Sequence, residues 1–136
     1  MIVVDATILT ALAFPTENSE AVDLLHKRDT EWASSILWRS EFLNVVAHYF
    51  RKNLITFPET LTTIDYIQKI VGIHEHRVSP QAVADLIVSS NCSAYECEYV
   101  ALAKELKTKL ITYDKEILDN FPDVASQPED YLAQFP

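Results

Sequence analysis

The sequence predicts an α/β fold in which helices cover both faces of a parallel sheet. Short apolar runs alternate along the chain with longer segments of helical periodicity. The first run, at residues 1–4, is apolar throughout, which is typical of a strand buried on both faces. The whole chain has 136 residues, of which 49% are hydrophobic and 23% are charged. This balance is typical of globular proteins, so we expect one domain spanning residues 1–136.

Local signals place the individual elements. The first apolar run ends at Asp5, Pro15 closes the helix after it, and Pro80 suits the first turn of a later helix. Apolar residues at helical spacing make residues 35–53 the longest helix. The expected elements, in chain order, are strand 1–4, helix 6–14, helix 19–28, strand 31–34, helix 35–53, helix 58–72, strand 76–78, helix 80–89, helix 93–106, strand 110–112, a short helix ending near 120, and an edge strand near 124–125.

Composition excludes several classes of protein. Lys and Arg number 11 and Asp and Glu number 20, so the net charge of −9 argues against a general electrostatic nucleic-acid binder. A local basic patch or a bound metal ion can still bring RNA to an acidic protein. Gly72 is the only glycine, which excludes the glycine-rich loops that hold phosphates and dinucleotides.

The two cysteines and the N-terminus indicate the compartment. Cys92 and Cys97 are too few for a disulfide scaffold or a four-ligand zinc site. The N-terminal stretch has an acid and no early cation, unlike a signal peptide, and no segment reaches the length of a membrane span. We therefore expect a cytoplasmic protein.

Two acids follow apolar strands directly. Asp5 and Asp114 stand at the carboxyl ends of their strands, the edge at which open parallel sheets build their sites. Each could simply cap the helix that follows it. Two acids in the same setting favour a shared site.

Two further acids lie on helices. Glu41 has mostly apolar neighbours on its helix face and no cation at helical spacing, so it is either at the edge of the apolar stripe in water or paired with a metal ion. Glu96 completes a capping box with Ser93, a role that is compatible with membership of an acidic site at the helix N-terminus.

Four segments together resemble the motif blocks of PIN-domain ribonucleases, and most closely VapC-like toxins of toxin–antitoxin pairs. They are Met-Ile-Val-Val-Asp-Ala-Thr at 1–7, Trp-Arg-Ser-Glu-Phe at 38–42, Cys-Ser-Ala-Tyr-Glu-Cys-Glu-Tyr-Val-Ala-Leu-Ala at 92–103 and Ile-Thr-Tyr-Asp at 111–114. The resemblance implies a three-layer α/β/α sandwich that holds Mg²⁺ or Mn²⁺ and cleaves RNA. It also implies a cognate antitoxin, and we expect a homodimer.

The resemblance assigns roles to particular residues. Asp5, Glu41 and Asp114 fall on the acidic positions of the family, and Thr7 and Thr112 fall on its hydroxyl positions. Glu96 departs from the pattern, because the family normally has Asp there, and the longer side chain moves the carboxylate by on the order of 1 Å. The expected metal-binding and catalytic set is thus Asp5, Glu41, Glu96 and Asp114.

Cations and aromatic residues complete the expectations. Arg39 and Lys115 are the expected substrate-binding residues, with Arg51, Lys52 and Lys104 as further candidates for contacting phosphate; for each of them the alternative is an ordinary surface cation. The expected core aromatics are Trp32, Trp38, Tyr49, Phe50, Tyr95 and Tyr99.

Two other functions compete with a ribonuclease. In the first, Glu96 has weakened the site and the fold only binds RNA or a partner protein. The second is a phosphoacceptor signalling domain, which fits poorly because Asp5 is single and Thr112-Tyr113 stands at the end of the late strand, where such domains carry Lys.

Overall fold

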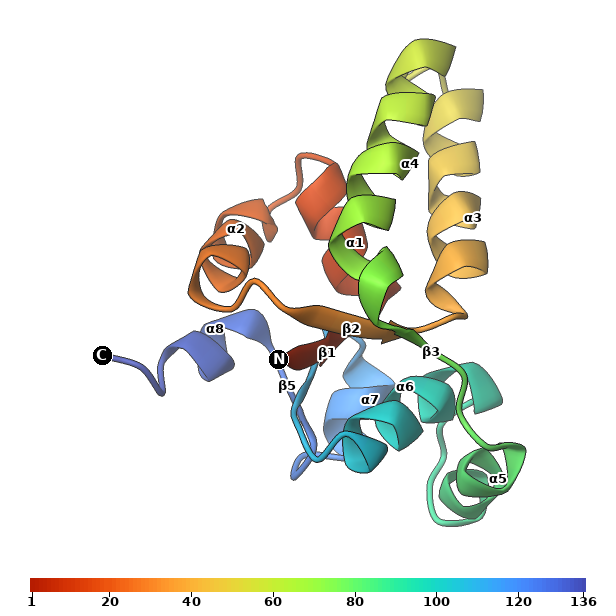
Figure 1. Ribbon diagram of the computed structural model, residues 1–136, viewed down its shortest axis with the longest axis vertical. Coiled ribbons are helices and arrows are strands. Elements are labelled where there is room, and N and C mark those ends of the chain that lie inside the picture. Colours follow the sequence, from red (N-terminus) through yellow and green to blue (C-terminus); the bar gives the residue numbers. More distant parts are fainter.

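The computed structural model describes residues 1–136, and a five-stranded sheet lies at its centre (Figure 1). All neighbouring strands are parallel, and their order across the sheet is β3-β2-β1-β4-β5. The strands are β1 (Ile2–Val4), β2 (Trp32–Ser35), β3 (Glu75–His76), β4 (Leu110–Ile111) and β5 (Ala125–Ser126). The expected parallel α/β fold is confirmed, and the first strand of the chain is its central strand.

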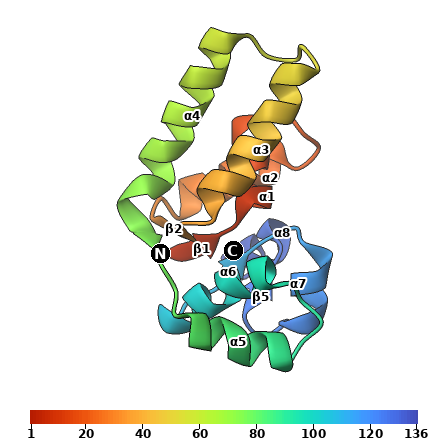
Figure 2. The same cartoon turned by 90° about the vertical axis from the view of Figure 1, so that its right-hand side faces the viewer.

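Helices cover both faces of this sheet. The helices are α1 (Ala6–Ala13), α2 (Ser19–Arg28), α3 (Trp38–Arg51), α4 (Phe57–Val71), α5 (Pro80–Val88), α6 (Ala94–Glu105), α7 (Lys115–Asn120) and α8 (Pro128–Leu132), with a 3-10 turn, η1, at Gly72–His74. Helices α1 to α4 lie on one side of the sheet and α5 to α7 on the other, as two perpendicular views show (Figures 1 and 2).

The central strand divides the core into two. Ile2 and Val4 of β1 face a cluster that includes residues of α1 to α4, whereas Val3 faces a cluster that includes residues of α5, α6 and α7. All three side chains are at most 1% exposed. This alternation is why the strand must be apolar at every position.

Helices α3 and α4 form an antiparallel arm that extends beyond the sheet (Figures 1 and 2). Its outer end is apolar, since Leu54, Phe57 and Leu61 are all more than half exposed there. Phe50 is also 45% exposed, so its expected place in the core was wrong, and Tyr95 on α6, at 63%, was wrong for the same reason. Phe50 and Tyr95 lie at the outer edge of the apolar face of their helices, where the face extends beyond the core.

The longest helix begins later than expected. Residues 35–53 were expected to be helical, but α3 begins at Trp38, because Ser35 belongs to β2 and pairs with His76 of β3. Serine is not among the residues that are enriched in strands, so composition alone did not place Ser35 in one. The outcome is that both Ser34 and Ser35 are fully buried in the sheet.

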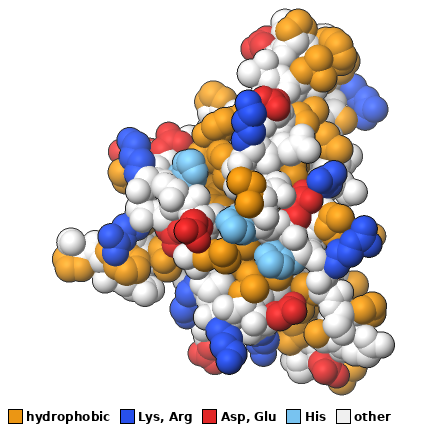
Figure 3. Space-filling view, viewed as in Figure 1, with side chains coloured by type: hydrophobic (Ala, Val, Ile, Leu, Met, Phe, Trp, Pro, Cys, Tyr) orange, Lys and Arg blue, Asp and Glu red, His pale blue; other side chains and the backbone are white.

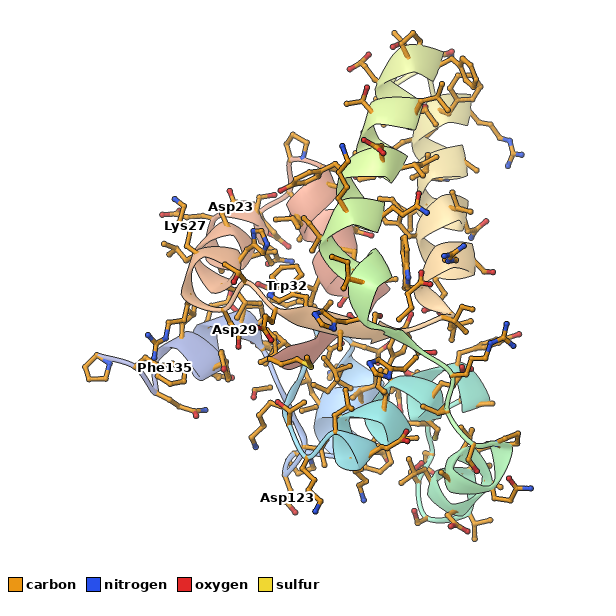
Figure 4. The ribbon with its side chains drawn as sticks, viewed as in Figure 1. Asp23, Lys27, Asp29, Trp32, Asp123 and Phe135 are labelled. Atoms are coloured by element: carbon orange, nitrogen blue, oxygen red, sulfur yellow. The ribbon has the colours of Figure 1, made fainter.

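The end of the chain packs beside α2. The guanidinium of Arg28 lies 4.0 Å from the ring centre of Phe135, and the N-terminal amine lies 3.4 Å from Asp29. Figure 4 shows Asp29 and Phe135 on this side of the molecule and Trp32 between α2 and the sheet. None of the helices combines the length and apolar character needed to cross a membrane.

Candidate acidic site

A cavity of about 510 Å³ opens at the carboxyl ends of β1 and β4. Helices α1, α3, α6 and α7 all contribute to its walls. Its acidic lining residues are Asp5, Glu17, Glu41, Glu96 and Asp114, and none of its 16 lining residues is Lys, Arg or His. The four acids expected to form a site thus line one cavity, which we call the acidic pocket.

Asp5 is the most buried of these acids, with 3% of its surface exposed. Its Oδ1 accepts hydrogen bonds from the backbone N–H groups of Thr7 and Ile8, at 3.0 and 3.4 Å, and caps α1. The hydroxyl of Thr7 also donates to Oδ1, at 2.5 Å, and the hydroxyl of Thr112 donates to Oδ2. The cap and the pocket are therefore two roles of one side chain, which the sequence left as alternatives.

Burial dominates the ionisation of Asp5. It raises the pKa of this carboxyl from 3.8 to about 6, although the hydrogen bonds from Thr112, Thr7 and Ile8 favour the charged form. The negative charge of Asp114 adds to the increase. A carboxylate at this position is thus costly unless a positive charge joins it.

Glu41 has a partner that the sequence did not indicate. The hydroxyl of Tyr99 on α6 donates a hydrogen bond of 2.6 Å to Oε1 of Glu41 on α3. Tyr99 is 2% exposed, and burial together with this bond to Glu41 raises the pKa of the phenol far above its ordinary value. Tyr99 therefore stays protonated and holds Glu41 against the pocket wall.

Glu96 forms the expected capping box. Its Oε1 accepts from the backbone N–H of Ser93 at 2.8 Å, and the hydroxyl of Ser93 accepts from the N–H of Glu96 at 3.1 Å. The extra methylene of Glu relative to Asp allows this carboxylate to reach back to the cap while it lines the pocket. The departure from the usual residue thus has a local structural role.

The carboxyl groups of Glu96 and Asp114 influence each other's ionisation. Burial raises the pKa of Asp114, and the hydrogen bond with Glu96 raises it further. Burial alone would also raise the pKa of Glu96, but hydrogen bonds from the Ser93 backbone, from Asp114 and from the Ser93 side chain lower it. Asp114 is therefore the more readily protonated of the two acids, and its side chain also caps α7 through the N–H of Ile117 at 3.2 Å.

The two threonines connect the acids. Thr112 is fully buried, donates to Asp5 and accepts from the backbone N–H of Asp114 at 2.8 Å. The hydroxyl of Thr7 accepts from the backbone N–H of Tyr113 at 3.0 Å. Both therefore fix the end of β4 against the start of α1.

The two cations expected to bind substrate do not line the pocket. Arg39 is held by Glu75, with Nε 2.7 Å from Oε1 and its terminal nitrogen 2.9 Å from Oε2, and Trp38 donates to the same carboxylate at 2.7 Å. Glu75 is on β3, so chain proximity gave no sign of this pair. Lys115 is exposed at the start of α7, directly after Asp114.

The donor set of the acidic pocket fits a hard divalent cation. Carboxylate and hydroxyl oxygens are the ligands that Mg²⁺ and Mn²⁺ prefer, and no cationic side chain neutralises the acids. No group of three or more Asp, Glu, His or Cys side chains converges closely enough to hold an ion without intervening molecules. Mg²⁺ usually keeps several of its waters, so ligation through water is compatible with this spacing.

Other lining residues escaped the sequence analysis. Asn44 lies one turn beyond Glu41 on α3, and Glu17 and Asn18 come from the loop before α2. The spacing of Asn44 from Glu41 placed it on the same helix face, which was the one available signal. Nothing local indicated that the loop at 16–18 reaches the pocket.

The comparisons with known proteins agree on one family. The sequence pattern described as "PIN domain" matches residues 2–124. The chain is also 26% identical over 124 residues to Ribonuclease VapC3 of Pyrobaculum aerophilum, a match that covers 89% of this chain and 95% of that protein.

Solved structures share the fold. The crystal structure of PAE2754 from Pyrobaculum aerophilum superimposes with a TM-score of 0.75 and 19% identity, covering 98% of this chain and 87% of the other. A toxin–antitoxin complex from Klebsiella pneumoniae gives a TM-score of 0.65 and 14% identity, covering 94% and 98%. At these identities the likeness concerns the fold alone.

Proposed function

Because the chain belongs to the PIN domain family, we propose that it is an endoribonuclease that depends on Mg²⁺ or Mn²⁺ and acts as the toxin of a toxin–antitoxin pair. The observation that carries the proposal is the acidic pocket, which is lined by five carboxylic acids and no cationic side chain at the carboxyl edge of the sheet. The similarity to a protein named Ribonuclease VapC3 over most of both chains supports the choice of RNA as substrate.

Asp5, Glu96 and Asp114 would hold the ion, directly or through water. When bound, the ion lowers the pKa of a water molecule and offsets the charge of the scissile phosphate. Thr7 and Thr112 keep Asp5 in one orientation through its two oxygens. Their hydroxyl donors also favour the charged form of Asp5 that ligation requires.

Glu41 would orient the attacking water and accept its proton. Oε1 of Glu41 is held by Tyr99, which leaves the second oxygen of the carboxylate available for this water. A carboxylate fixed by a neutral donor keeps its position as the reaction proceeds. No nucleophilic side chain is needed, since water attacks the phosphorus.

A cleavage assay tests the proposal. Purified protein is incubated with single-stranded and structured RNA in Mg²⁺, in Mn²⁺ and with a chelator. We expect divalent-dependent cutting that falls by about 100-fold or more in Asp5→Asn and Asp114→Asn. The matched control is Asp119→Asn, because Asp119 is an exposed acid on the same helix as Lys115 and lies outside the pocket.

The controls separate enzyme from contaminant. Asp119→Asn should cut at the rate of the unmodified protein. Cutting that persists in both Asp5→Asn and Asp114→Asn would come from another nuclease and would contradict the proposal.

The toxin role adds a partner. We expect the protein to act in the cytoplasm and its expression to arrest the growth of the cells. A small antitoxin should relieve the arrest by placing a basic side chain in the acidic pocket and an apolar helix beside it. The shared fold with a chain of a toxin–antitoxin complex supports this role. Harmless high-level expression of an active nuclease would contradict it. Light scattering of the purified protein tests the homodimer that we propose.

A second candidate is a PIN-fold module that binds RNA or protein without cutting. The capping box favours it, because Glu96 Oε1 is already engaged by Ser93 at 2.8 Å. Tight RNA binding without divalent-dependent cleavage, in wild type and in Glu96→Asp alike, would support this candidate over the enzyme.

A further inference from the structure

A second cavity adjoins the acidic pocket along α3. It has a volume of about 480 Å³ and is lined by Asn44, Val45, His48, Arg51 and Lys52. Asn44 and Val45 also line the acidic pocket, so the two cavities share a wall. Figure 2 shows α3 running from the sheet out along the arm, so the second cavity leads from the acids toward the arm's tip.

Helical spacing places the polar residues of this second cavity in a row. Asn44, His48 and Arg51 are four and three residues apart, so they fall on one face of α3, and Lys52 continues the row. By helix geometry, Arg51 lies about 15 Å along the axis from Glu41. All four polar residues are exposed. We call them the α3 row.

The cations of the α3 row are free. Arg51 and Lys52 take part in no ion pair or side-chain hydrogen bond, whereas Arg39 and Lys69 on the same arm are both paired with acids. No Asp or Glu occurs between residues 44 and 56. In the space-filling view, Lys and Arg side chains appear at the edge of the molecule where α3 lies, and apolar side chains gather at the arm's tip (Figure 3).

The charge of the whole chain makes this local patch significant. A chain of net charge −9 repels RNA over most of its surface, and the acidic pocket repels phosphate most of all in the absence of a cation. An RNA strand that enters the acidic pocket therefore needs cations beside it. The α3 row is a cationic surface that continues directly from the pocket wall.

We propose that the α3 row binds the phosphate backbone of single-stranded RNA a few nucleotides away from the bond held at the acidic pocket. Arg51 and Lys52 contact phosphates, and Asn44 and His48 donate to the strand between them and the acids. The proposal rests on RNA as the substrate under the proposed function. In this proposal, α3 carries both Glu41 of the acidic pocket and the residues that bind the RNA backbone.

Binding without metal isolates this contact from catalysis. The full chain, with a chelator present, is titrated against a fluorescent single-stranded RNA of about a dozen nucleotides. We expect the Arg51→Gln/Lys52→Gln double variant to bind on the order of tenfold more weakly at about 0.1 M salt. Its salt dependence should flatten, with the slope of log Kd against log salt falling by about 0.7 for each lost phosphate contact.

The control carries the same change of charge at another place. Lys27 and Arg77 are exposed and unpaired, and Figure 4 shows Lys27 pointing away from α2 into solvent. Lys27→Gln/Arg77→Gln should retain the affinity and salt slope of wild type. Should the α3 double variant unfold, Lys52→Gln alone, at the end of the helix, gives the same comparison with one contact removed.

Cleavage kinetics in Mn²⁺ provide the second measurement. The α3 double variant should raise KM for the long RNA and leave kcat unchanged, because Arg51 and Lys52 contact neither the acids nor the scissile bond. Equal affinity and salt slope in both double variants would overturn the proposal and leave the row to an acidic segment of a protein partner. RNA binding that depends on the row, without any divalent-dependent cutting, would instead refute the proposed enzyme and retain this inference.

Discussion

The two sides of the acidic pocket accommodate negative charge in different ways. On the sheet side, Asp5 is almost fully buried, and burial raises its pKa to about 6. On the helix side, Glu96 and Asp114 are less buried, and their carboxyl groups influence each other's ionisation. Desolvation is the largest influence on both sides, but on the helix side the neighbouring carboxyl group of Glu96 raises the pKa of Asp114 further. A cation that enters the pocket would offset the negative charge on both sides.

The largest expected effect on stability is its dependence on pH, which tests the role of Asp5 on the sheet side of the acidic pocket. Since the pKa of Asp5 is higher in the folded chain than in the unfolded one, the folded chain binds this proton more tightly between pH 4 and 6. The contribution of Asp5 to stability should therefore be greatest below about pH 4 and fall as the pH rises through 6, by about 3 kcal/mol. Asp5→Asn should remove this loss.

Chemical denaturation of metal-free protein at two pH values measures it. Asp5→Asn should be the more stable protein at pH 8 and should match wild type near pH 3.5. A variant that is less stable than wild type at pH 8 would show that the cap on α1 outweighs the buried charge.

Divalent cations should stabilise the folded chain by an amount close to this. At a free metal concentration about 100 times Kd, Mn²⁺ should add about 2.7 kcal/mol to the free energy of unfolding. The melting temperature should rise with Mn²⁺ in wild type and much less in Asp114→Asn, which loses a charge of the helix side. Equal increases in both proteins would remove Asp114 from the metal site.

The contact between Tyr99 and Glu41 should contribute less. Tyr99→Phe removes a hydrogen bond to a carboxylate without changing the shape of the core, and we expect a loss of about 1.5 kcal/mol. Thermal unfolding checks the stability. If Tyr99 also positions Glu41, the pH profile of RNA cleavage should shift in Tyr99→Phe, whereas a purely structural tyrosine would leave the profile unchanged.

The smallest change in stability is expected at Glu96. Gln accepts the same hydrogen bond from the Ser93 backbone, so Glu96→Gln should lie within about 0.5 kcal/mol of wild type. Its metal-dependent cleavage should nevertheless be lost, and Glu96→Asp should keep or raise it. Glu98→Gln is the matched control, because Glu98 is on the same helix and accepts from Ser35 outside the pocket. Cleavage by Glu96→Gln at the wild-type rate in limiting Mn²⁺ would exclude Glu96 from the site.

The sequence predicted what short-range chemistry determines. Ser93 with Glu96, and Asp114 before α7, are caps whose donors and acceptors lie within three residues, and both are confirmed. The position of β1 followed from its unbroken apolar character. These features need no knowledge of the distant chain.

Contacts between distant elements could not be predicted in the same way. Tyr99 meets Glu41 across 58 residues and Arg39 meets Glu75 across 36, and in each case the partner is one of many residues able to form the bond. The family resemblance brought Glu41 to the site but gave no partner for it. Only the tertiary packing of α6 beside the first turn of α3 brings Tyr99 to Glu41.

The order of the strands has a consequence for synthesis of the chain. β1 is made first, yet it pairs on one side with β4, and Thr112 hydrogen-bonds to Asp5 across 107 residues. Closing so long a loop is slow and requires most of the chain to have left the ribosome. A nascent or truncated chain that ends before β4 has Asp5 but neither Thr112 nor Asp114. Incomplete products of translation therefore lack the acidic pocket.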